Sequence, residues 1–185
     1  DVAPVATTPD AFVNTTTLRE AIAATAAEAA DRLPEVRASA VVDLLRRDPP
    51  RTRSGAPLAE VVDEQVAAAI TASLLDLDDS YIAVQGPPGT GKTYTGSRVI
   101  AALARDHGWR IGVVGQSHSV IENLLDGVVA AGLDPESVAK KGSSDSTHSW
   151  LGVDSYSGYL ATHTGGCVVG ATAWPFTNRK EVAEQ

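Results

Sequence analysis

The spacing of hydrophobic residues changes near residue 80 of this 185-residue chain. In the first part, apolar residues recur every three or four positions, which is typical of helices with one buried face. This pattern predicts three helices, over residues 17–33, 35–47 and 58–75. Thr17 and Glu20 have the spacing of a capping box at the start of the first helix. The side chains expected to be buried on the first two helices are Leu18, Ile22, Ala26, Ala29, Leu33, Val36, Ala40 and Leu44.

After residue 80, short apolar runs alternate with helical stretches. Strands are expected at residues 81–84, 111–114 and 167–170, and helices at residues 92–106 and 118–131. This alternation predicts an α/β fold in which helices flank a parallel sheet. In the second of these helices, the residues expected to face inward are Val120, Ile121, Leu124, Leu125 and Val128. Residues 142–166 are rich in small polar residues and are expected to form a surface loop.

The chain therefore divides into a helical N-terminal segment with a linker, residues 1–57, and an α/β domain, residues 58–185. Residues 1–14 show no period and are expected to form an extended arm. Residues 48–56 contain proline, glycine and arginine, and we expect them to form a solvated connection.

Charge limits the partners that the chain can bind. The net charge is −8, with a balance of −7 in residues 1–85 and of −1 in residues 86–185. An acidic chain argues against a large nonspecific nucleic-acid surface. It leaves room for a narrow groove that binds a single strand through a few donors.

Cysteine usage and hydropathy indicate the compartment. The single cysteine, Cys167, allows no internal disulfide, which favours a reducing cytoplasm, and its apolar neighbours predict a buried side chain. No apolar run reaches the roughly 18 residues that a membrane span requires, and no signal peptide is visible. We expect a cytoplasmic protein without a membrane partner. Because the chain begins at Asp1 and has no methionine, we expect it to be a piece of a longer protein.

Residues 86–93, Gly-Pro-Pro-Gly-Thr-Gly-Lys-Thr, contain the phosphate-loop (Walker A) pattern G-x-x-x-x-G-K-[ST]. Glycines let the backbone approach a polyphosphate, so that its N–H groups and the following helix N-terminus can bind the anion. Lys92 adds a mobile positive charge for the β- and γ-phosphates, and the hydroxyl of Thr93 is a ligand for Mg²⁺. The sequence therefore predicts that ATP and Mg²⁺ bind here, with Lys92 and Thr93 as the catalytic residues. The expected nucleotide contacts are Gly86, Pro87, Pro88, Gly89, Thr90, Gly91, Lys92, Thr93 and Tyr94.

ATP hydrolysis also needs an aspartate for Mg²⁺ and a base for water, normally as Asp-Glu at the end of a later strand. The only candidate is Asp63-Glu64, which lies before the loop in a helical pattern. We expect these carboxylates to face solvent. This chain alone is therefore expected to bind ATP without hydrolysing it.

Four segments resemble motifs of the first motor domain of superfamily 1 helicases, in the branch that contains the nonsense-mediated-decay helicase. They are residues 64–67 (Glu-Gln-Val-Ala), 84–96, 114–125 (Val-Gly-Gln-Ser-His and onward) and 168–174 (Val-Val-Gly-Ala-Thr-Ala-Trp). The resemblance to this motor domain covers residues 58–175, and it includes a resemblance to bacterial predicted RecB-like nuclease–helicase fusion proteins. The resemblance implies a RecA-like P-loop NTPase fold, present here as an incomplete motor domain.

The resemblance also implies roles for single residues. Gln65 would select adenine, because an amide both donates and accepts hydrogen bonds. Ser117, His118 and Thr172 would contact a single nucleic-acid strand, and Lys140 would contact its phosphate. The full-length protein would be an ATP-dependent helicase, with DNA as the expected strand. The second motor domain and a nuclease domain of that family have no counterpart in this chain and are the expected partners.

Some of these residues have simpler interpretations, which the sequence leaves open. Ser117 has the position of a helix cap, Gln65 and His118 are ordinary helix residues, and Thr172 is a hydroxyl at a strand end. Trp174, beside that strand end, is a candidate for stacking on bases.

Two other functions are compatible with the loop. A protein-remodelling ATPase of the AAA type carries the same octet, but its Asp-Glu strand is expected within about 60 residues of the loop, and none follows here. The other is a nucleotide-dependent binding module that does not hydrolyse ATP.

Overall fold

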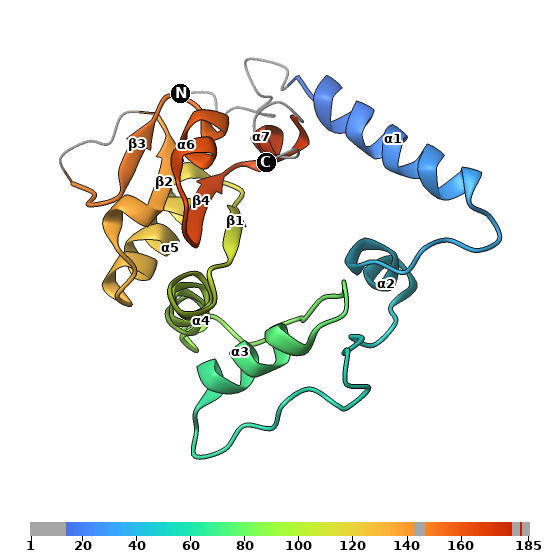
Figure 1. Ribbon diagram of the computed structural model, residues 1–185, viewed down its shortest axis with the longest axis horizontal. Helices are drawn as coiled ribbons and strands as arrows, with labels where there is room; N and C mark the ends of the chain where they lie inside the picture. Colours follow the sequence, from blue (N-terminus) through green and yellow to red (C-terminus); the bar gives the residue numbers. More distant parts are fainter. Residues whose placement is uncertain (1–13, 143–146, 179–181, 183–185) are drawn as a thin grey trace, which may run out of the picture.

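A computed structural model describes residues 14–142, 147–178 and 182 of the chain. Its centre is a four-stranded sheet in the order β1-β4-β2-β3, and all strand pairs are parallel (Figure 1). The strands are β1 (Arg110–Val114), β2 (Val138–Lys141), β3 (Leu151–Val153) and β4 (Cys167–Ala171). The predicted α/β fold with a parallel sheet is confirmed.

Helices cover both faces of the sheet. On one face, α4 (Lys92–His107) and α5 (His118–Ala130) pack over the apolar side chains of β1, β2 and β4. On the other face, α6 (Tyr156–Thr162) and the short α7 (Ala173–Thr177) enclose a second core. A 3₁₀ turn, η1 (Pro135–Ser137), leads into β2. The two helices predicted to flank the sheet, at residues 92–106 and 118–131, are thus present as α4 and α5.

Strand β4 lies at the middle of this arrangement, and all five of its residues are buried. Gly170 is required where α5 crosses the strand, because a Cβ there would lie 2.6 Å from Ile121 and 2.8 Å from Leu125. Both of these α5 side chains have no exposed surface. Each such burial contributes roughly 2 kcal/mol of hydrophobic stabilisation, so the α5–β4 contact holds α5 against the sheet.

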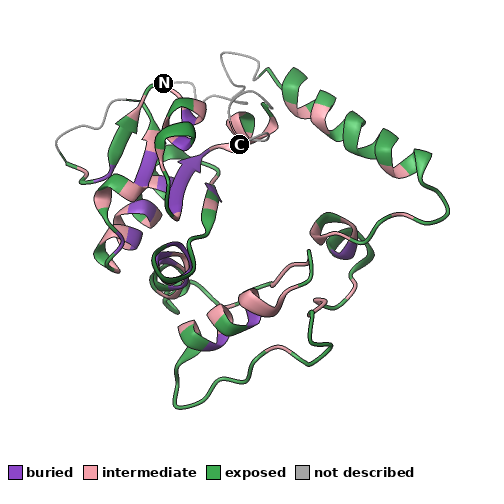
Figure 2. Cartoon of the chain, viewed as in Figure 1, coloured by how far each residue is buried: buried purple, intermediate pink, exposed green. Residues whose placement is uncertain are grey.

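The N-terminal half forms an open arc beside the sheet, made of α1 (Thr16–Asp31), α2 (Ala40–Arg46) and α3 (Val66–Asp76) (Figure 1). Figure 2 shows buried residues concentrated around the sheet and few along the arc. Helix α3 packs on α4, whereas α1 buries no residue. No helix in the described ranges is long and apolar enough to cross a membrane.

Within the arc, a polar network joins α2 to the segment after α3. The carboxylate of Asp43, 2% exposed, accepts hydrogen bonds from Arg51 Nε at 3.0 Å and Ser80 Oγ at 2.7 Å. Arg51 also pairs with Asp78 at 3.1 Å. Residues 48–56, expected to be a solvated connection, thus provide the arginine that joins the two segments.

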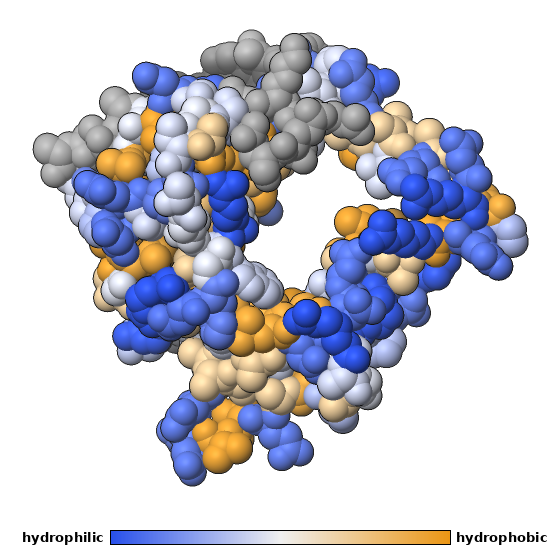
Figure 3. Space-filling view, in the orientation of Figure 1, coloured by the Kyte–Doolittle hydropathy of each residue, from blue (hydrophilic) through white to orange (hydrophobic). Residues whose placement is uncertain are grey.

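The helices of the arc are shorter than predicted. Helix α2 begins at Ala40 after the cap residue Ser39, and α3 begins at Val66 rather than near residue 58. The expected capping box does not form, because the side chain of Asn14 accepts the N–H of Thr16 instead. The expected burial on α1 and α2 is wrong, since Ile22, Leu33 and Leu44 are 69%, 67% and 58% exposed. Local spacing set the helices, and the contact of α1 with α7 leaves Ile22 and Leu33 mostly exposed. Figure 3 shows apolar surface along the arc as well as over the sheet.

Three further differences concern the α/β part. Residues 81–84 form no strand and lie outside the sheet, and Val84 is 52% exposed. The segment 142–166, expected to be a loop, contains β3 and α6, and its residues 143–146 lie outside the described residues. Val120 on α5 faces solvent instead of the core. Residues 81–84 form no strand because they have no neighbouring strand to pair with in the described part of the chain. Strand β3 was not predicted because a run of three residues shows too little period. Most of the expected arm at residues 1–14 also lies outside the described residues.

The network around Asp43 gives a stability prediction. Replacing Asp43 by alanine leaves the half-buried Arg51 without its main partner and is expected to cost about 2 kcal/mol of local stability. Hydrogen–deuterium exchange should then speed up around residues 51 and 80 while β4 stays protected. Asp78→Ala is the matched control, because Asp78 is 58% exposed and its pair contributes at most about 1 kcal/mol. Equal effects of the two substitutions would contradict this account.

Candidate functional site

The predicted phosphate loop is a tight turn that leads directly into α4. Gly89 and Gly91 have φ of 81° and 78°, in the left-handed region that favours glycine. Gly91 is the residue that caps α4. A Cβ on Gly86 would lie 2.7 Å from the hydroxyl of Thr90. The loop geometry therefore favours glycine at all three glycine positions of residues 86–93.

Lys92 folds back over this turn. Its ammonium donates to the carbonyl oxygens of Gly86 at 2.5 Å and Pro87 at 2.8 Å, and Thr90 Oγ1 donates to the same Pro87 oxygen at 2.8 Å. The first turn of α4 contains no acidic residue, so nothing in it opposes the positive end of the helix dipole. Lys92 and the helix N-terminus thus bring positive charge to one exposed loop.

The next two predicted contacts follow on the first turn of α4. Thr93 is exposed, and its backbone carbonyl accepts a hydrogen bond from Ser97 Oγ at 2.8 Å. Tyr94 is 63% exposed, and the guanidinium of Arg98 lies 3.4 Å from the centre of its ring. One face of the Tyr94 ring is therefore covered by a cation, while the hydroxyl of Thr93 is open to solvent.

Gln65 and the upstream acidic pair lie outside the loop. Gln65 is the exposed residue that precedes α3, which packs on α4. Asp63 and Glu64 have positive φ of 48° and 59° and form an exposed turn, not part of a helix as expected. Their predicted exposure to solvent is confirmed. Within the described residues, no group of three or more His, Cys, Asp or Glu is placed to share a metal ion.

A second group of predicted residues meets at the carboxyl ends of β2 and β4. There a pocket of about 220 Å³ is lined by His118, Lys140, Lys141, Tyr156, Gly170, Ala171, Thr172 and Pro175. His118, Lys140 and Thr172 come from three segments that are far apart in the sequence, and the fold brings them to one edge of the sheet. We name this cavity the strand-end pocket.

Ser117 and Trp174 flank the strand-end pocket. Ser117 caps α5, accepting the N–H of Val120 at 3.4 Å, as its simpler interpretation predicts. Trp174, 38% exposed, lines a neighbouring pocket of about 270 Å³ that shares Lys141 and Pro175 with the first. Its indole N–H donates to the carbonyl of Asn14 at 2.9 Å, which ties the start of α1 to α7.

Tyr156 shapes the pocket and was not predicted from the sequence. This buried residue donates its hydroxyl proton to the carbonyl of Gly170 at 2.7 Å and accepts the N–H of Lys141 at 3.1 Å. It thereby joins the ends of β2 and β4. No local pattern indicates this role, because Tyr156 lies in the segment expected to be a loop.

Cys167 at the start of β4 is 1% exposed, as its apolar neighbours predicted. Burial raises the pKa of its thiol, and the nearby Arg110 opposes that rise only in part. The thiol therefore stays protonated at neutral pH, and it has a packing role in the second core.

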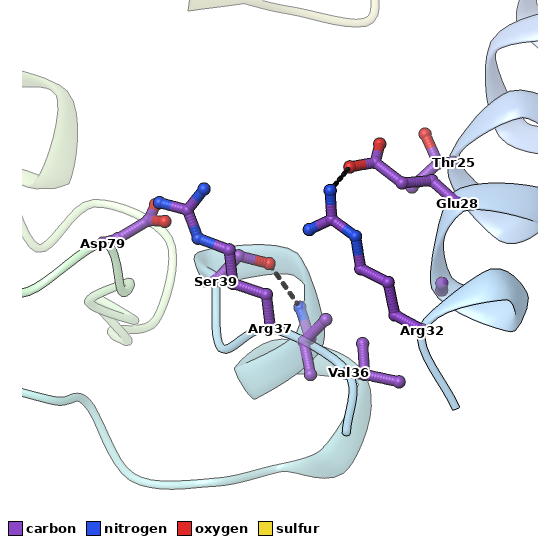
Figure 4. A pocket seen from close by; sticks show the side chains of 9 residues that line it. Thr25, Glu28, Arg32, Val36, Arg37, Ser39 and Asp79 are labelled. Atoms are coloured by element: carbon purple, nitrogen blue, oxygen red, sulfur yellow. Dashed lines mark hydrogen bonds and ion pairs between the residues drawn. The ribbon is translucent and has the colours of Figure 1, made fainter. Parts of the chain in front are cut away.

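A separate pocket of about 270 Å³ lies between the end of α1 and the start of α2 (Figure 4). It contains two arginines, but Arg32 pairs with Glu28 at 2.9 Å, and Arg37 points toward Asp79 in Figure 4. These acidic side chains offset the positive charge. The pocket includes none of the residues that the sequence predicts for binding, and we assign it no ligand.

Comparison with family models, curated proteins and solved structures finds no match for this chain. The fold and the site define its class as an α/β protein with an all-parallel sheet flanked by helices.

Two glycines of the loop and its helix provide a matched pair for mutation. Gly96→Ala on α4 meets open space and should stabilise the protein by about 0.5 to 1 kcal/mol, because alanine is the better helix former. Gly86→Ala should lower the melting temperature, because its Cβ displaces Thr90. Thermal melting without ligand tests both, and a stabilised Gly86→Ala variant would disagree with the loop geometry.

Proposed function

We propose that this chain binds ATP with Mg²⁺ at residues 86–94 and forms the nucleotide-binding part of an ATP-dependent helicase. The observation that supports this most is the exposed turn of left-handed glycines that leads into a 16-residue helix free of acidic residues in its first turn. Backbone N–H groups, a helix N-terminus and one lysine are a donor set suited to a polyphosphate. The proposal includes the assignment of the α/β domain to the RecA-like P-loop NTPase fold.

Lys92 exchanges partners when nucleotide binds. In the free loop its ammonium is bound to two carbonyl oxygens, and phosphate oxygens with full negative charge are stronger acceptors. Thr93 provides the hydroxyl that holds Mg²⁺, and the bound ion supplies charge neutralisation between the phosphates. Gln65, on the helix that packs against α4, is proposed to select adenine.

A single nucleic-acid strand is proposed to cross the carboxyl edge of the sheet, where ligands bind in open α/β folds. The strand-end pocket gathers His118, Lys140 and Thr172 there. The exposed part of Trp174 is available for stacking on a base. Because the chain is acidic overall, we propose a narrow contact with DNA rather than a broad basic surface.

Hydrolysis and movement along the strand are proposed for the full-length protein, not for this chain alone. In the described residues, the upstream acidic pair Asp63-Glu64 forms an exposed turn and ends no strand. The proposed partners are the remaining parts of the full-length protein, a second motor domain and a nuclease domain, and the proposed compartment is the cytoplasm. A binding module that responds to nucleotide without hydrolysing it is the second candidate, favoured by the same exposed turn.

Lys92→Ala tests the nucleotide site. Wild-type protein at an ATP–Mg²⁺ concentration of 100 times the Kd should gain about 2.7 kcal/mol of stability. The variant should lose this gain, because its loop has no ammonium for the phosphates. Lys141→Ala, a lysine outside the loop, should keep it. Thermal melting with and without nucleotide measures both, and an unchanged shift in Lys92→Ala would refute the assignment.

ATP turnover by the isolated chain should be negligible, because no Asp-Glu pair ends a strand in the part of the chain that the structure describes. A phosphate-release assay on the purified chain measures this, with Lys92→Ala as the background control. Robust turnover that depends on Lys92 would show that the chain carries a complete hydrolytic site.

Nucleic-acid binding should prefer single strands and weaken with salt. The logarithm of the affinity should fall against that of the salt concentration with a slope of about −0.7 per phosphate contacted. Fluorescence anisotropy with matched single-stranded and duplex oligonucleotides measures this. Equal binding to both forms would count against a helicase.

A further inference from the structure

Lys140 lines the strand-end pocket, yet its charge is already paired within the protein. Its ammonium lies 3.1 Å from a carboxylate oxygen of Glu122 on α5. The side chains of Lys140 and Glu122 are 12% and 27% exposed. In such a partly desolvated setting an ion pair is screened less than at the open surface.

Trp150 supports this pair from the side. The ammonium of Lys140 lies 5.8 Å from the centre of the Trp150 ring, within the range of a cation–π contact. Trp150 is itself fixed, because its indole N–H donates to Asp126 at 2.9 Å and its ring stacks on His148. The lysine is thus held between a carboxylate and an aromatic face.

Glu122 also borders the groups that attract an anion. It follows His118 by four residues on α5, so the two side chains lie on one face of the helix. His118 and Lys141 line the same pocket as Lys140. A phosphate that enters the pocket therefore competes with the Glu122 carboxylate for the ammonium of Lys140.

We propose that Glu122 is an internal counter-ion, whose carboxylate pairs with Lys140 when no strand is bound. The pair lowers the affinity of the strand-end pocket for single-stranded DNA. This inference rests on the function proposed for that pocket. When a strand binds, its phosphate replaces the carboxylate, and Glu122 turns toward the solvent to which it is already partly open. The exchange makes binding weaker and less dependent on salt than the positive charges of the pocket alone would give.

A purely structural role for the pair leads to the opposite expectation. If Lys140 and Glu122 only join β2 to α5, loss of the carboxylate loosens the pocket and weakens binding. If Glu122 competes with phosphate, its loss strengthens binding. The sign of the change in affinity therefore separates the two roles.

The experiment measures binding of a fluorescein-labelled oligo-dT of about 12 nucleotides, a length within the site sizes of single-strand grooves, by anisotropy at low salt. Glu122→Gln keeps the shape of the side chain and should tighten binding about fivefold, the size of one surface ion pair. The salt slope should steepen by up to about 0.7, because no carboxylate is left to take up a cation when the strand binds.

Two further variants test whether the effect comes from net charge alone and whether it acts through Lys140. Glu136→Gln removes the same charge from an exposed residue before β2 and should change the affinity little. Lys140→Gln should weaken binding, and in that background Glu122→Gln should give no gain. Thermal melting of each variant reports whether it is folded.

The outcomes separate this inference from the proposed function. If wild-type protein binds the oligonucleotide and Glu122→Gln binds equally or more weakly, the counter-ion role is overturned and the pocket assignment stands. A gain that persists with Lys140→Gln, or that Glu136→Gln matches, also overturns it, because the effect is then one of net charge. If neither wild type nor Glu122→Gln binds, both ideas about the pocket fail, while the nucleotide shift that depends on Lys92 is judged separately.

Discussion

The contact between α5 and the buried strand β4 sets the geometry of the α/β part. Because residue 170 is glycine, Ile121 and Leu125 can pack directly on the strand. This close contact fixes both the position and the rotation of α5. It therefore decides that Ser117 and His118 lie at the carboxyl edge of the sheet, and that Glu122 and Asp126 face Lys140 and Trp150. The hydrophobic side of one helix thus determines the electrostatics of its polar side.

The phosphate loop depends on a different constraint. Its shape follows from backbone conformations that glycine adopts at low cost and from contacts within eight residues. This local character explains why the pattern could be read from the sequence. It also means that the loop keeps its turn although residues 81–84 before it do not join the sheet. Charge at the loop is provided by Lys92 and the helix end together, whereas charge at the strand-end pocket is partly cancelled by Glu122.

In the arc formed by α1, α2 and α3, helices form without burying much apolar surface. Its helices form where local spacing favours them, but α1 has no buried residue and α2 buries only Asp43. The connection within the arc is mainly polar and passes through Asp43, Arg51 and Ser80. Exposed apolar side chains remain on α2, among them Val41 and Leu45. A polar network of this kind sets how α2 lies against the segments that contain Arg51 and Ser80. Most of the buried apolar surface belongs to the sheet and its two cores.

The sequence by itself determined the features that depend on neighbouring residues. The glycine pattern of residues 86–91, the helix that begins at Lys92, the cap at Ser117 and the apolar strands β1 and β4 were all predicted. Turn conformation, capping and periodicity are local properties. The tertiary structure alone decided which of these parts meet. It assembled His118, Lys140 and Thr172 in one pocket, paired Lys140 with Glu122, placed β3 and α6 where a loop was expected, and left residues 81–84 without a strand partner. Strand pairing, burial and ion pairing join residues that are distant in the chain, and no local pattern records those distances.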